Sequence, residues 1–397
     1  MGKKIKIGFL SEVDLYDITQ LSGTSYNLRK IFEVKGYEVI PVDKLDQGFH
    51  FIRFYQKVKT KVYRKLLGVN YRPEWTKTGS KLLAKRAMKM IRKNKPDILF
   101  TWSTPILAHL DVNIPKILYT DATFSLMLGF YGNFSNFTSK SIDTGDDLAA
   151  KAFENADRLI FSSKWAANSA LQNYGISERK VHVVTLGANL DVNHDEVFIR
   201  ELIRSKSGKT LHLLFMGVDW KRKGGEKALE VARIIKEKGR KVCLHLMGSK
   251  PPDDKKLPDY VVNHGFVSKA QPEGRKHMDE IFRKVHFLVL PTFADCTPMV
   301  YAELNAYGIP AITHDVGGIS SVVYHETNGL IFSTQSTAEQ MAEKIMACFE
   351  NPKQYDDLAL SSFKTFKGKL NWSQTGESLS KHIHEVLEKN HLTNKNL

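Results

Sequence analysis

The chain has 397 residues, of which 42% are hydrophobic and 25% charged; this composition is typical of a globular protein, and the length predicts two or three domains. No apolar run approaches the roughly 20 residues of a membrane-spanning helix, and Glu12 and Asp14 interrupt the first apolar run, which argues against a signal peptide. The spacings of Cys243, Cys296 and Cys348 predict neither a disulfide framework nor a zinc site, so we expect a reduced, cytoplasmic protein without a bound metal or cofactor.

The first half of the chain alternates strand and helix patterns. A buried strand is predicted over 5–10, and a turn followed by a helix covers 22–32 and ends near Gly36. Further apolar, β-branched runs predict strands over 37–42, 97–101, 116–119, 158–161 and 180–184. Strands that alternate with helices favour an α/β fold, in which helices cover both faces of a parallel sheet.

Nearly all of the net charge of +15 lies in one segment of this first half. Residues 51–95 hold fifteen lysines and arginines but a single acid, Glu74, and therefore carry +14. Apolar residues of the segment keep roughly helical spacing, at Phe51, Phe54, Tyr55, Val58, Val62 and Leu66. A basic amphipathic helix is typical of membrane-surface binding, and a solvated basic face is the alternative. The cations of this predicted helix include Arg53, Lys57, Lys61, Arg64 and Lys65.

The strand and helix pattern restarts after a polar stretch, 200–209. Strands are predicted over 210–216, 242–247, 261–267, 285–290, 309–313 and 329–332, and helices over 227–238 and 373–389. We therefore expect an N-terminal domain of residues 1–195 and a second domain of 196–370. The C-terminal helix, 371–397, could belong to either domain and is a candidate to pack back on the first.

Two positions in the first half stand where α/β proteins bind ligands, after strands and before helices. Gly23-Thr24 precedes a helix and could approach a phosphate, although helix capping by Thr24 or Ser25 is the alternative. Asp121 follows the apolar strand that ends at Tyr119 and is a candidate active-site acid. A capping role at the next helix is the alternative for this aspartate.

The segment MGVDWKRKGG, residues 216–225, follows a strand and precedes a helix. Glycines allow backbone N–H groups to approach a diphosphate closely, and Lys or Arg side chains neutralise its charge. Gly217, Arg222 and Lys223 are therefore candidates for a diphosphate site. A solvated turn with basic side chains is the alternative.

The segment FADCTPMVYAE, residues 293–303, places two carboxylates, Asp295 and Glu303, eight positions apart after a buried strand. Thr297-Pro298 predicts the start of a helix, with Glu303 two turns into it. Carboxylates accept hydrogen bonds from sugar or ribose hydroxyls, and a helix N-terminus attracts phosphate. This combination of groups favours a sugar nucleotide as the ligand.

These segments resemble the donor-binding signature of retaining glycosyltransferases with the GT-B fold, in particular the large fourth family, or glycosyl transferases group one. The motifs PTFAD (291–295), ELNAYGIP (303–310) and VGG (316–318) carry the resemblance. The family pattern is an acid, seven residues and then glutamate, and here Asp295 replaces the usual first glutamate. The similarity also extends over GFVSK (265–269), FMG (215–217), KG (223–224), SSKW (162–165) and GAN (187–189).

The resemblance implies two Rossmann-like domains that face each other across a cleft, and it implies roles for single residues. Glu303 would bind the ribose hydroxyls, Asp295 would face the donor sugar and Lys223 would bind the diphosphate. The family's partner arginine usually follows the glycine matching Gly217, so Arg222 or Lys221 would have to replace it. Asp121 stands where many relatives have a histidine near the acceptor. Base, sugar or phosphate contacts are implied for Gly23, Thr24, Gly217, Val267, Ser268, Thr297, Met299 and, through its neighbours' N–H groups, Pro298.

The implied reaction transfers a sugar, with retention of configuration, from a UDP-, GDP- or ADP-sugar to a glycan or lipid-linked acceptor. Lys223 would stabilise the charge that develops on the leaving nucleoside diphosphate. A bound metal is not expected, because the chain has no Asp-x-Asp pair. The basic helix would meet the acceptor or an anionic membrane at the cytoplasmic inner leaflet. The alternatives are a nucleotide-sugar 2-epimerase on the same fold and, less favoured because the acid pair stays unexplained, a nucleic-acid-binding protein.

Overall fold

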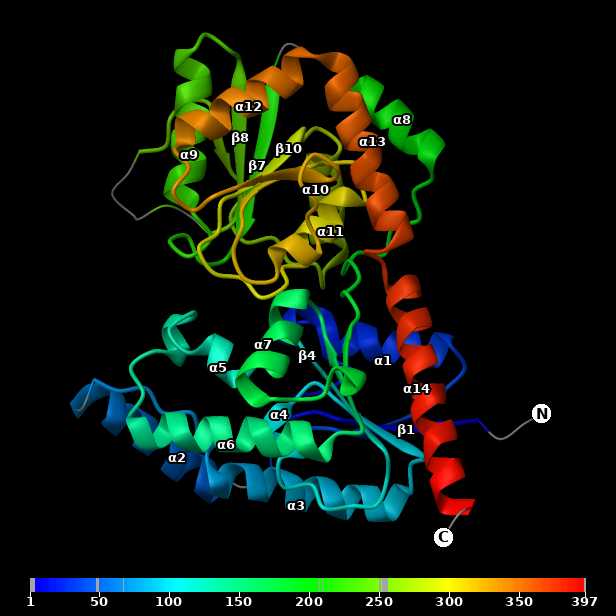
Figure 1. Ribbon diagram of the computed structural model, residues 1–397. Helices are drawn as coiled ribbons and strands as arrows, with labels where there is room; N and C mark the ends of the chain where they lie inside the picture. The colour runs from blue at the N-terminus through cyan, green and yellow to red at the C-terminus, as the bar shows by residue number, and fades with distance from the viewer. Residues whose placement is uncertain are drawn as a thin grey trace. The chain divides into compact units, whose positions relative to one another are not determined.

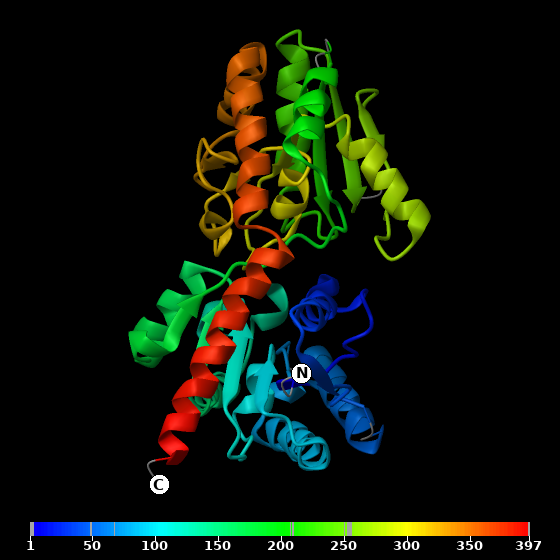
Figure 2. The same ribbon diagram turned by 90° about the vertical axis from the view of Figure 1, so that its right-hand side faces the viewer.

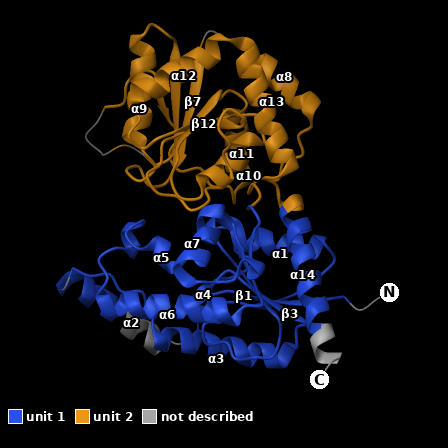
Figure 3. Cartoon of the chain, viewed as in Figure 1, with its two compact units in different colours: residues 1–185, 375–397 blue, residues 186–374 orange. Residues whose placement is uncertain are grey.

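The chain forms two compact units (Figure 3), the first of residues 1–185 and 375–397 and the second of residues 186–374. Each unit is built on its own six-stranded sheet, in which every neighbouring pair of strands is parallel. The computed structural model describes residues 4–47, 50–66, 68–206, 208, 210–249, 251 and 256–395. Within these ranges, the side chains of 50–57 and 391–395 are not described.

The sheet of the first unit has the strand order β2-β1-β3-β4-β5-β6. Its central strands are continuous apolar runs, and every residue of β3 and β4 is buried, as expected where helices cover both faces of a parallel sheet. The strands are β1 (Lys6–Leu10), β2 (Glu38–Val42), β3 (Ile98–Thr101), β4 (Lys116–Thr120), β5 (Arg158–Phe161) and β6 (Val181–Val183).

Helices cover both faces of this first sheet (Figure 1). Helices α3, α4 and α6 lie together on one face, and α1 lies on the other with the C-terminal helix α14 (Trp372–Lys395), which belongs to this unit from Thr375 onward. Figure 2 shows α14 passing beside α1, and a Cβ atom on Gly376 of α14 would lie 2.4 Å from the side chain of Ile31 of α1. The other helices are α1 (Thr24–Val34), α2 (His50–Leu66), α3 (Lys77–Asn94), α4 (Thr104–Leu107), α5 (Phe124–Met127), α6 (Ser139–Asn155) and α7 (Lys164–Tyr174).

The sheet of the second unit has the order β12-β11-β10-β7-β8-β9. Its strands are β7 (Leu211–Gly217), β8 (Val242–Gly248), β9 (Val261–Asn263), β10 (Phe287–Leu290), β11 (Ala311–His314) and β12 (Gly329–Phe332). Helices α9 and α12 pack together on one face, and α8, α11 and α13 lie on the other (Figure 1). The helices are α8 (Glu196–Ser205), α9 (Gly225–Glu237), α10 (Pro272–Phe282), α11 (Val300–Asn305), α12 (Ala338–Glu350) and α13 (Pro352–Gly368).

All twelve strands that the sequence predicts are present, but two predictions are wrong in their bounds. The strand predicted over 261–267 ends at Asn263, before Gly265 turns the chain with a φ of +64°. Helix α11 begins at Val300 rather than at Thr297, because Pro298 disfavours the helical conformation at Thr297, the residue before it. Glu303 therefore lies in the first turn of this helix, not two turns into it.

No helix in the described residues is long and apolar enough to cross a membrane. This agrees with the apolar runs of the sequence, which are short. Helix α2, by contrast, has the length and position that the spacing of apolar residues in the basic segment predicts.

Candidate functional site

The loop between β7 and α9 is held against the segment that follows β10. Gly224, the residue before α9, has a φ of +78°, and a Cβ atom there would lie 2.1 Å from the carbonyl oxygen of Pro291. At Gly217 a Cβ would lie 2.9 Å from the side chain of Lys223. Both glycines are therefore required by close approach. Gly217 lies against Lys223 of its own loop, and Gly224 brings this loop to the segment after β10, at the carboxyl ends of neighbouring strands.

A buried ion pair joins these two loops. The Lys223 Nζ atom lies 2.6 Å from Oδ2 of Asp295, and both side chains are only 11% exposed. The hydroxyl of Thr292 donates to the same oxygen over 3.0 Å. Arg222 donates to the carbonyl oxygen of Ala294 over 2.6 Å, and its Nη1 lies 3.4 Å from Oδ1 of Asp295. Asp295 thus holds two cations at the edge of the second sheet.

One of the two candidate cations for the partner of Lys223 lies near Asp295. The sequence leaves Arg222 and Lys221 as candidates, and the structure brings Arg222 to Asp295 while Lys221 is exposed. Val218, which occupies the place of the family's usual arginine, is 70% exposed. A buried carboxylate is costly unless it is paired, so the two cations also keep the Asp295 loop in place.

Glu303 is the most buried acid of this region. Its residue is 1% exposed, and one carboxylate oxygen, Oε1, forms an ion pair with the ammonium group of Lys269. The other oxygen, Oε2, is buried and has no hydrogen-bond partner. An unsatisfied buried acceptor costs free energy, so this oxygen is placed to accept a further hydrogen bond.

Two residues of other segments form hydrogen bonds with the backbone of the Asp295 loop. His314 ends β11 and is fully buried; its Nδ1–H donates to the carbonyl oxygen of Thr292 over 3.1 Å. Burial, together with the charge of Lys227, lowers the pKa of His314 to about 4, so the ring is neutral. Gly318 of the VGG motif donates its N–H to the carbonyl oxygen of Asp295 over 3.3 Å.

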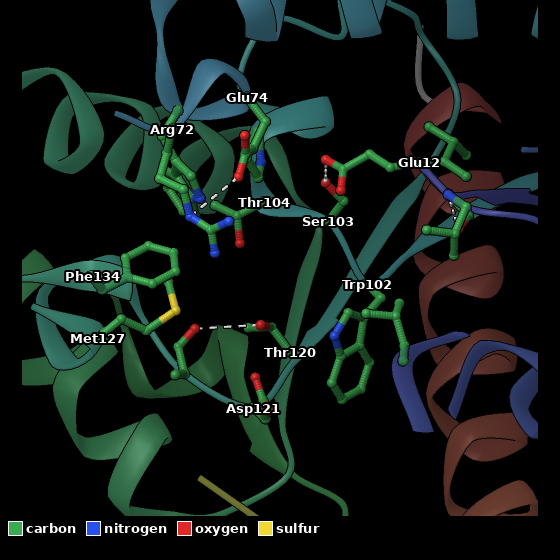
Figure 4. A pocket seen from close by; sticks show the side chains of 17 residues that line it. Glu12, Arg72, Glu74, Trp102, Ser103, Thr104, Thr120, Asp121, Met127 and Phe134 are labelled. Carbon is green, nitrogen blue, oxygen red and sulfur yellow. Dashed lines mark hydrogen bonds and ion pairs between the residues drawn. The ribbon is translucent and has the colours of Figure 1, made fainter. Parts of the chain in front are cut away.

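A pocket in the first unit lies at the carboxyl ends of β1, β3 and β4 (Figure 4). It encloses about 250 Å³ and is lined by charged and aromatic side chains. The candidate acid Asp121, which directly follows β4, is among the lining residues. The others labelled in Figure 4 are Glu12, Arg72, Glu74, Trp102, Ser103, Thr104, Thr120, Met127 and Phe134.

The acid Glu12 is the most perturbed group of this pocket. Burial raises the pKa of its carboxyl group to about 7, although the hydrogen bond of 2.6 Å that Ser103 donates to it acts to lower the pKa. Across the pocket, Arg72 lies 3.6 Å from Glu74 (Figure 4). A carboxyl group that titrates near neutral pH can accept or donate a proton there. The sequence carried a signal for this residue, because Glu12 stands two positions after β1, where ligands bind in such sheets.

Two protein-family models match consecutive parts of the chain. The model of glycosyltransferase family 4 matches residues 30–192, and that of glycosyl transferases group 1 matches residues 200–364. The chain belongs to the group 1 glycosyl transferases. Its two Rossmann-like units are those of the GT-B fold, as the sequence resemblance implied.

Known relatives of this group 1 glycosyl transferase are distant in sequence. The D-inositol 3-phosphate glycosyltransferase of Pseudarthrobacter chlorophenolicus is 23% identical over 245 residues, which are 59% of this chain and 57% of the relative. The matches thus span little more than half the length of the curated relatives. Among solved structures, sucrose-phosphate synthase of Thermosynechococcus elongatus superposes with a TM-score of 0.70 at 14% identity and covers 98% of this chain and all of its own. The HepE protein of Anabaena, in complex with UDP-glucose, gives 0.63 at 13% identity, with 96% and 100% covered.

The other residues that the glycosyl transferase signature implies lie around Glu303 and Asp295 in the second unit or at one helix start in the first. Met299 is the residue before α11, and its sulfur accepts a hydrogen bond of 3.0 Å from Asn189. Val267 and Ser268 directly precede Lys269, whose ammonium reaches Glu303. Thr297, with 9% exposure, and Pro298 lie on the chain between the two acids. No role had been assigned to Lys269 from the sequence, although it ends the GFVSK motif.

Gly23 and Thr24 begin α1 in the first unit. Gly23 precedes the helix in the left-handed conformation, with a φ of +84°, and no side chain caps the helix. The alternative that Thr24 or Ser25 acts as the capping residue is therefore wrong. The left-handed conformation favours glycine, and the hydroxyl oxygen of Ser25 is buried without a partner.

The basic helix α2 presents both charged and apolar side chains to solvent. Lys61, Arg64 and Lys65 are exposed, whereas the side chains of Arg53 and Lys57 lie outside the described residues. Three apolar side chains at successive helical turns are also exposed; they are Val58 at 41%, Val62 at 41% and Leu66 at 77%. Such an apolar stripe among cations is the pattern of a helix that lies on a membrane surface.

Proposed function

We propose that this protein transfers a sugar from a nucleoside-diphosphate sugar to a glycan or lipid-linked acceptor, with retention of configuration. The observation that carries the proposal is the buried, unpartnered Oε2 of Glu303, eight positions after Asp295, which pairs with Lys223. A carboxylate oxygen of this kind accepts a hydrogen bond from a ribose hydroxyl. The names of the relatives support the same activity, and HepE, a neighbour in fold, holds UDP-glucose.

On the donor side, the chemistry requires stabilisation of the leaving diphosphate. Lys223 and Arg222 are fixed before the substrate arrives, because Asp295 and the Ala294 carbonyl hold them. Preorganised cations of this kind stabilise developing negative charge without reorganisation, which is usually the largest contribution to catalysis. Retention of configuration is part of the proposal and rests on the family's acid pattern.

Glu303→Gln tests the donor site. The glutamine amide is an uncharged acceptor for a hydroxyl group of the nucleotide. Because hydrogen bonds to charged groups contribute about 1.5–3 kcal/mol, the affinity for the preferred nucleotide should fall by roughly 10- to 100-fold. Titration calorimetry with UDP, GDP and ADP measures the affinity and identifies the base. The matched control is Glu230→Gln, an exposed position on α9, which should bind as the unchanged protein does. Equal affinity in both variants would refute the proposed donor site.

We assign the acceptor to the pocket of the first unit, where Asp121 and Glu12 offer carboxyl groups to hydroxyls. The exposed stripe of α2 supports a lipid-linked acceptor at an anionic membrane surface. Co-sedimentation with phosphatidylserine–phosphatidylcholine vesicles at low salt tests this. Each cation near such a surface contributes about 1 kcal/mol, so reversal of Lys61, Arg64 and Lys65 to Glu should weaken binding more than about tenfold.

The control for the vesicle experiment carries the same change of charge elsewhere. Lys344, Lys353 and Lys364 are exposed on helices of the second unit, and their reversal to Glu should leave binding close to that of the unchanged protein. If both triple variants lose binding equally, net charge rather than helix α2 is responsible. If the unchanged protein does not sediment with anionic vesicles, the membrane proposal is wrong.

A further inference from the structure

Three metal-ligating side chains converge in the second unit, away from the residues discussed above. They are His212 of β7 and Cys243 and His245 of β8, and their potential ligand atoms all lie within 4.8 Å of one another. His245 is 7% exposed, and the other two are partly exposed. The donor-site loops and the pocket of the first unit use none of them.

The pairing of the two strands explains this convergence. His212 lies directly opposite Cys243 in the parallel ladder of β7 and β8, so both side chains emerge on the same face of the sheet. His245 follows Cys243 by two positions on the same strand, and alternate residues of a strand share a face. His212 and Cys243 are 31 positions apart in the sequence, so the cluster is not evident from the sequence alone.

The distances between these groups are close to those around a tetrahedral ion. Nδ1 of His212 lies 3.1 Å from Nε2 of His245, and Sγ of Cys243 lies 3.6 Å from the same nitrogen. Bonds of about 2.0–2.1 Å from Zn²⁺ to nitrogen and about 2.3 Å to sulfur place two ligand nitrogens about 3.4 Å apart, and a nitrogen and a sulfur about 3.6 Å apart. Two of the three distances are therefore within a few tenths of an ångström of the tetrahedral values, and the third, between His212 and Cys243, is at most 4.8 Å.

We propose that His212, Cys243 and His245 form a binding site for a transition-metal ion of the Zn²⁺ type. Two imidazole nitrogens and one thiolate suit Zn²⁺ or Co²⁺, whereas Mg²⁺ and Ca²⁺ require oxygen ligands. Three protein ligands leave one position of a tetrahedral ion for water. On binding, the Cys243 thiol loses its proton to solvent, and its sulfur forms the bond to the metal.

A row of imidazole rings orients the ligand His245. Nδ1 of His245 lies 3.0 Å from Nε2 of His264, and Nδ1 of His264 lies 3.2 Å from Nε2 of His277. When Nε2 of His245 binds a metal, its Nδ1–H can donate to His264. Such a second partner fixes the ring of a metal-binding histidine.

A fourth neighbour, His286, stabilises the fold and is not a ligand. Its Nδ1 accepts the backbone N–H of His212 over 3.0 Å, and its Nε2–H donates to the carbonyl oxygen of Lys206 over 2.9 Å. Both ring nitrogens are therefore used. The hydrogen bond to the backbone of His212 anchors that ligand's strand next to β10.

The metal site lies at the opposite end of the strands from the donor loop. His212 and Cys243 stand at the second position of their strands, and Gly217 and Gly248 end them. Five residues of a strand span about 16 Å, so the metal is remote from Lys223 and Asp295. The proposal is thus independent of the proposed transferase activity, and its test does not measure sugar transfer.

Cobalt titration of the chelator-treated full chain tests the proposal. We expect one Co²⁺ per chain, with the absorption bands of a tetrahedral ion and a sulfur-to-cobalt charge-transfer band, and Zn²⁺ should displace it. Cys243→Ser should lose the charge-transfer band, and His245→Gln should bind about tenfold or more weakly. The control, Cys348→Ser, alters a buried cysteine of α12 outside the cluster and should keep both the band and the stoichiometry.

A second measurement on the unchanged protein does not depend on the folding of any variant. Cys243 is partly exposed, so alkylation at mildly alkaline pH, read by peptide mass spectrometry, should label it slowly, and one equivalent of Zn²⁺ should suppress the labelling. Equal labelling with and without Zn²⁺, the absence of stoichiometric Co²⁺ binding, or a charge-transfer band that persists in Cys243→Ser would each overturn the proposal.

Discussion

Three carboxyl groups of this glycosyl transferase differ in the partners that the structure gives them. Asp295 has two cations and a hydroxyl, Glu303 has one lysine and an unpartnered oxygen, and Glu12 has a hydroxyl from Ser103. The carboxylate of Asp295 is fixed by its partners, that of Glu303 has one oxygen left to accept a donor, and that of Glu12 holds its proton to higher pH. Burial alone therefore does not decide what an acid can do.

The raised pKa of Glu12 predicts a pH-dependent stability. Its pKa is about 7 in the folded chain, against an ordinary value of 4.5, because burial disfavours the charged form. The charges of Glu74 and Asp46 also raise the pKa, whereas the hydrogen bond from Ser103 and the charge of Arg72 lower it. The folded state therefore binds the proton more tightly, and stability falls as pH rises from about 4.5 to about 7. Glu12→Gln should raise the free energy of unfolding at pH 8 by on the order of 2–3 kcal/mol and change it little at pH 4.

Urea denaturation at both pH values measures this effect. The glutamine retains an acceptor for the Ser103 hydroxyl, so the comparison isolates the charge. Glu178→Gln, at an exposed position of the same unit, should change stability little at either pH. A stabilisation by Glu12→Gln that is equal at pH 4 and pH 8 would show that the charge of Glu12 is not its cause.

At the scale of elements, the turn before α9 depends on a glycine for two reasons. Gly224 has a left-handed φ of +78°, and its Cβ would meet the Pro291 carbonyl oxygen at 2.1 Å. Gly239 has a similar φ of +83° but nothing within 4 Å. Gly239→Ala should therefore cost only the conformational penalty of about 1–2 kcal/mol, whereas Gly224→Ala should cost this plus about 1–3 kcal/mol of overpacking. Chemical denaturation of both variants separates the two terms, and equal losses would rule out the packing contribution.

The sequence predicts the elements well because buried parallel strands are continuous apolar runs between helices. The donor-side candidates Lys223, Asp295 and Glu303 are also accessible from the sequence, because each follows a predicted strand closely. Partners that come from a distant part of the chain cannot be predicted from the sequence in this way; Lys269, for example, pairs with Glu303, which lies 34 positions later. The helix start at Val300 was missed because Pro298 favours the first helical turn as well as a loop.

At the scale of the whole molecule, the chain passes from one unit to the other near residue 185 and again near residue 374. The two passing segments are hydrogen-bonded to each other. Thr375 donates its hydroxyl to the Thr185 carbonyl oxygen over 2.9 Å in the first unit. In the second unit, Ala188 donates its N–H to the Leu370 carbonyl oxygen over 3.0 Å. The beginning and the end of the second unit are thus held together as one structure.

Gly187 lies at the closest approach of these segments, and its replacement tests how tightly they are packed. A Cβ at this position would lie 2.4 Å from the backbone nitrogen of Trp372 and 2.6 Å from the carbonyl carbon of Asn371. Because backbone atoms cannot turn aside as a flexible side chain can, Gly187→Ala should displace one segment and lower the free energy of unfolding by about 1–3 kcal/mol. The control is Gly368→Ala, at the end of α13, where nothing lies within 4 Å. Calorimetric unfolding should show a lower Tm for Gly187→Ala alone, since Gly368→Ala adds a methyl group in open space; identical Tm values would mean that the two segments are not packed as closely as the structure shows.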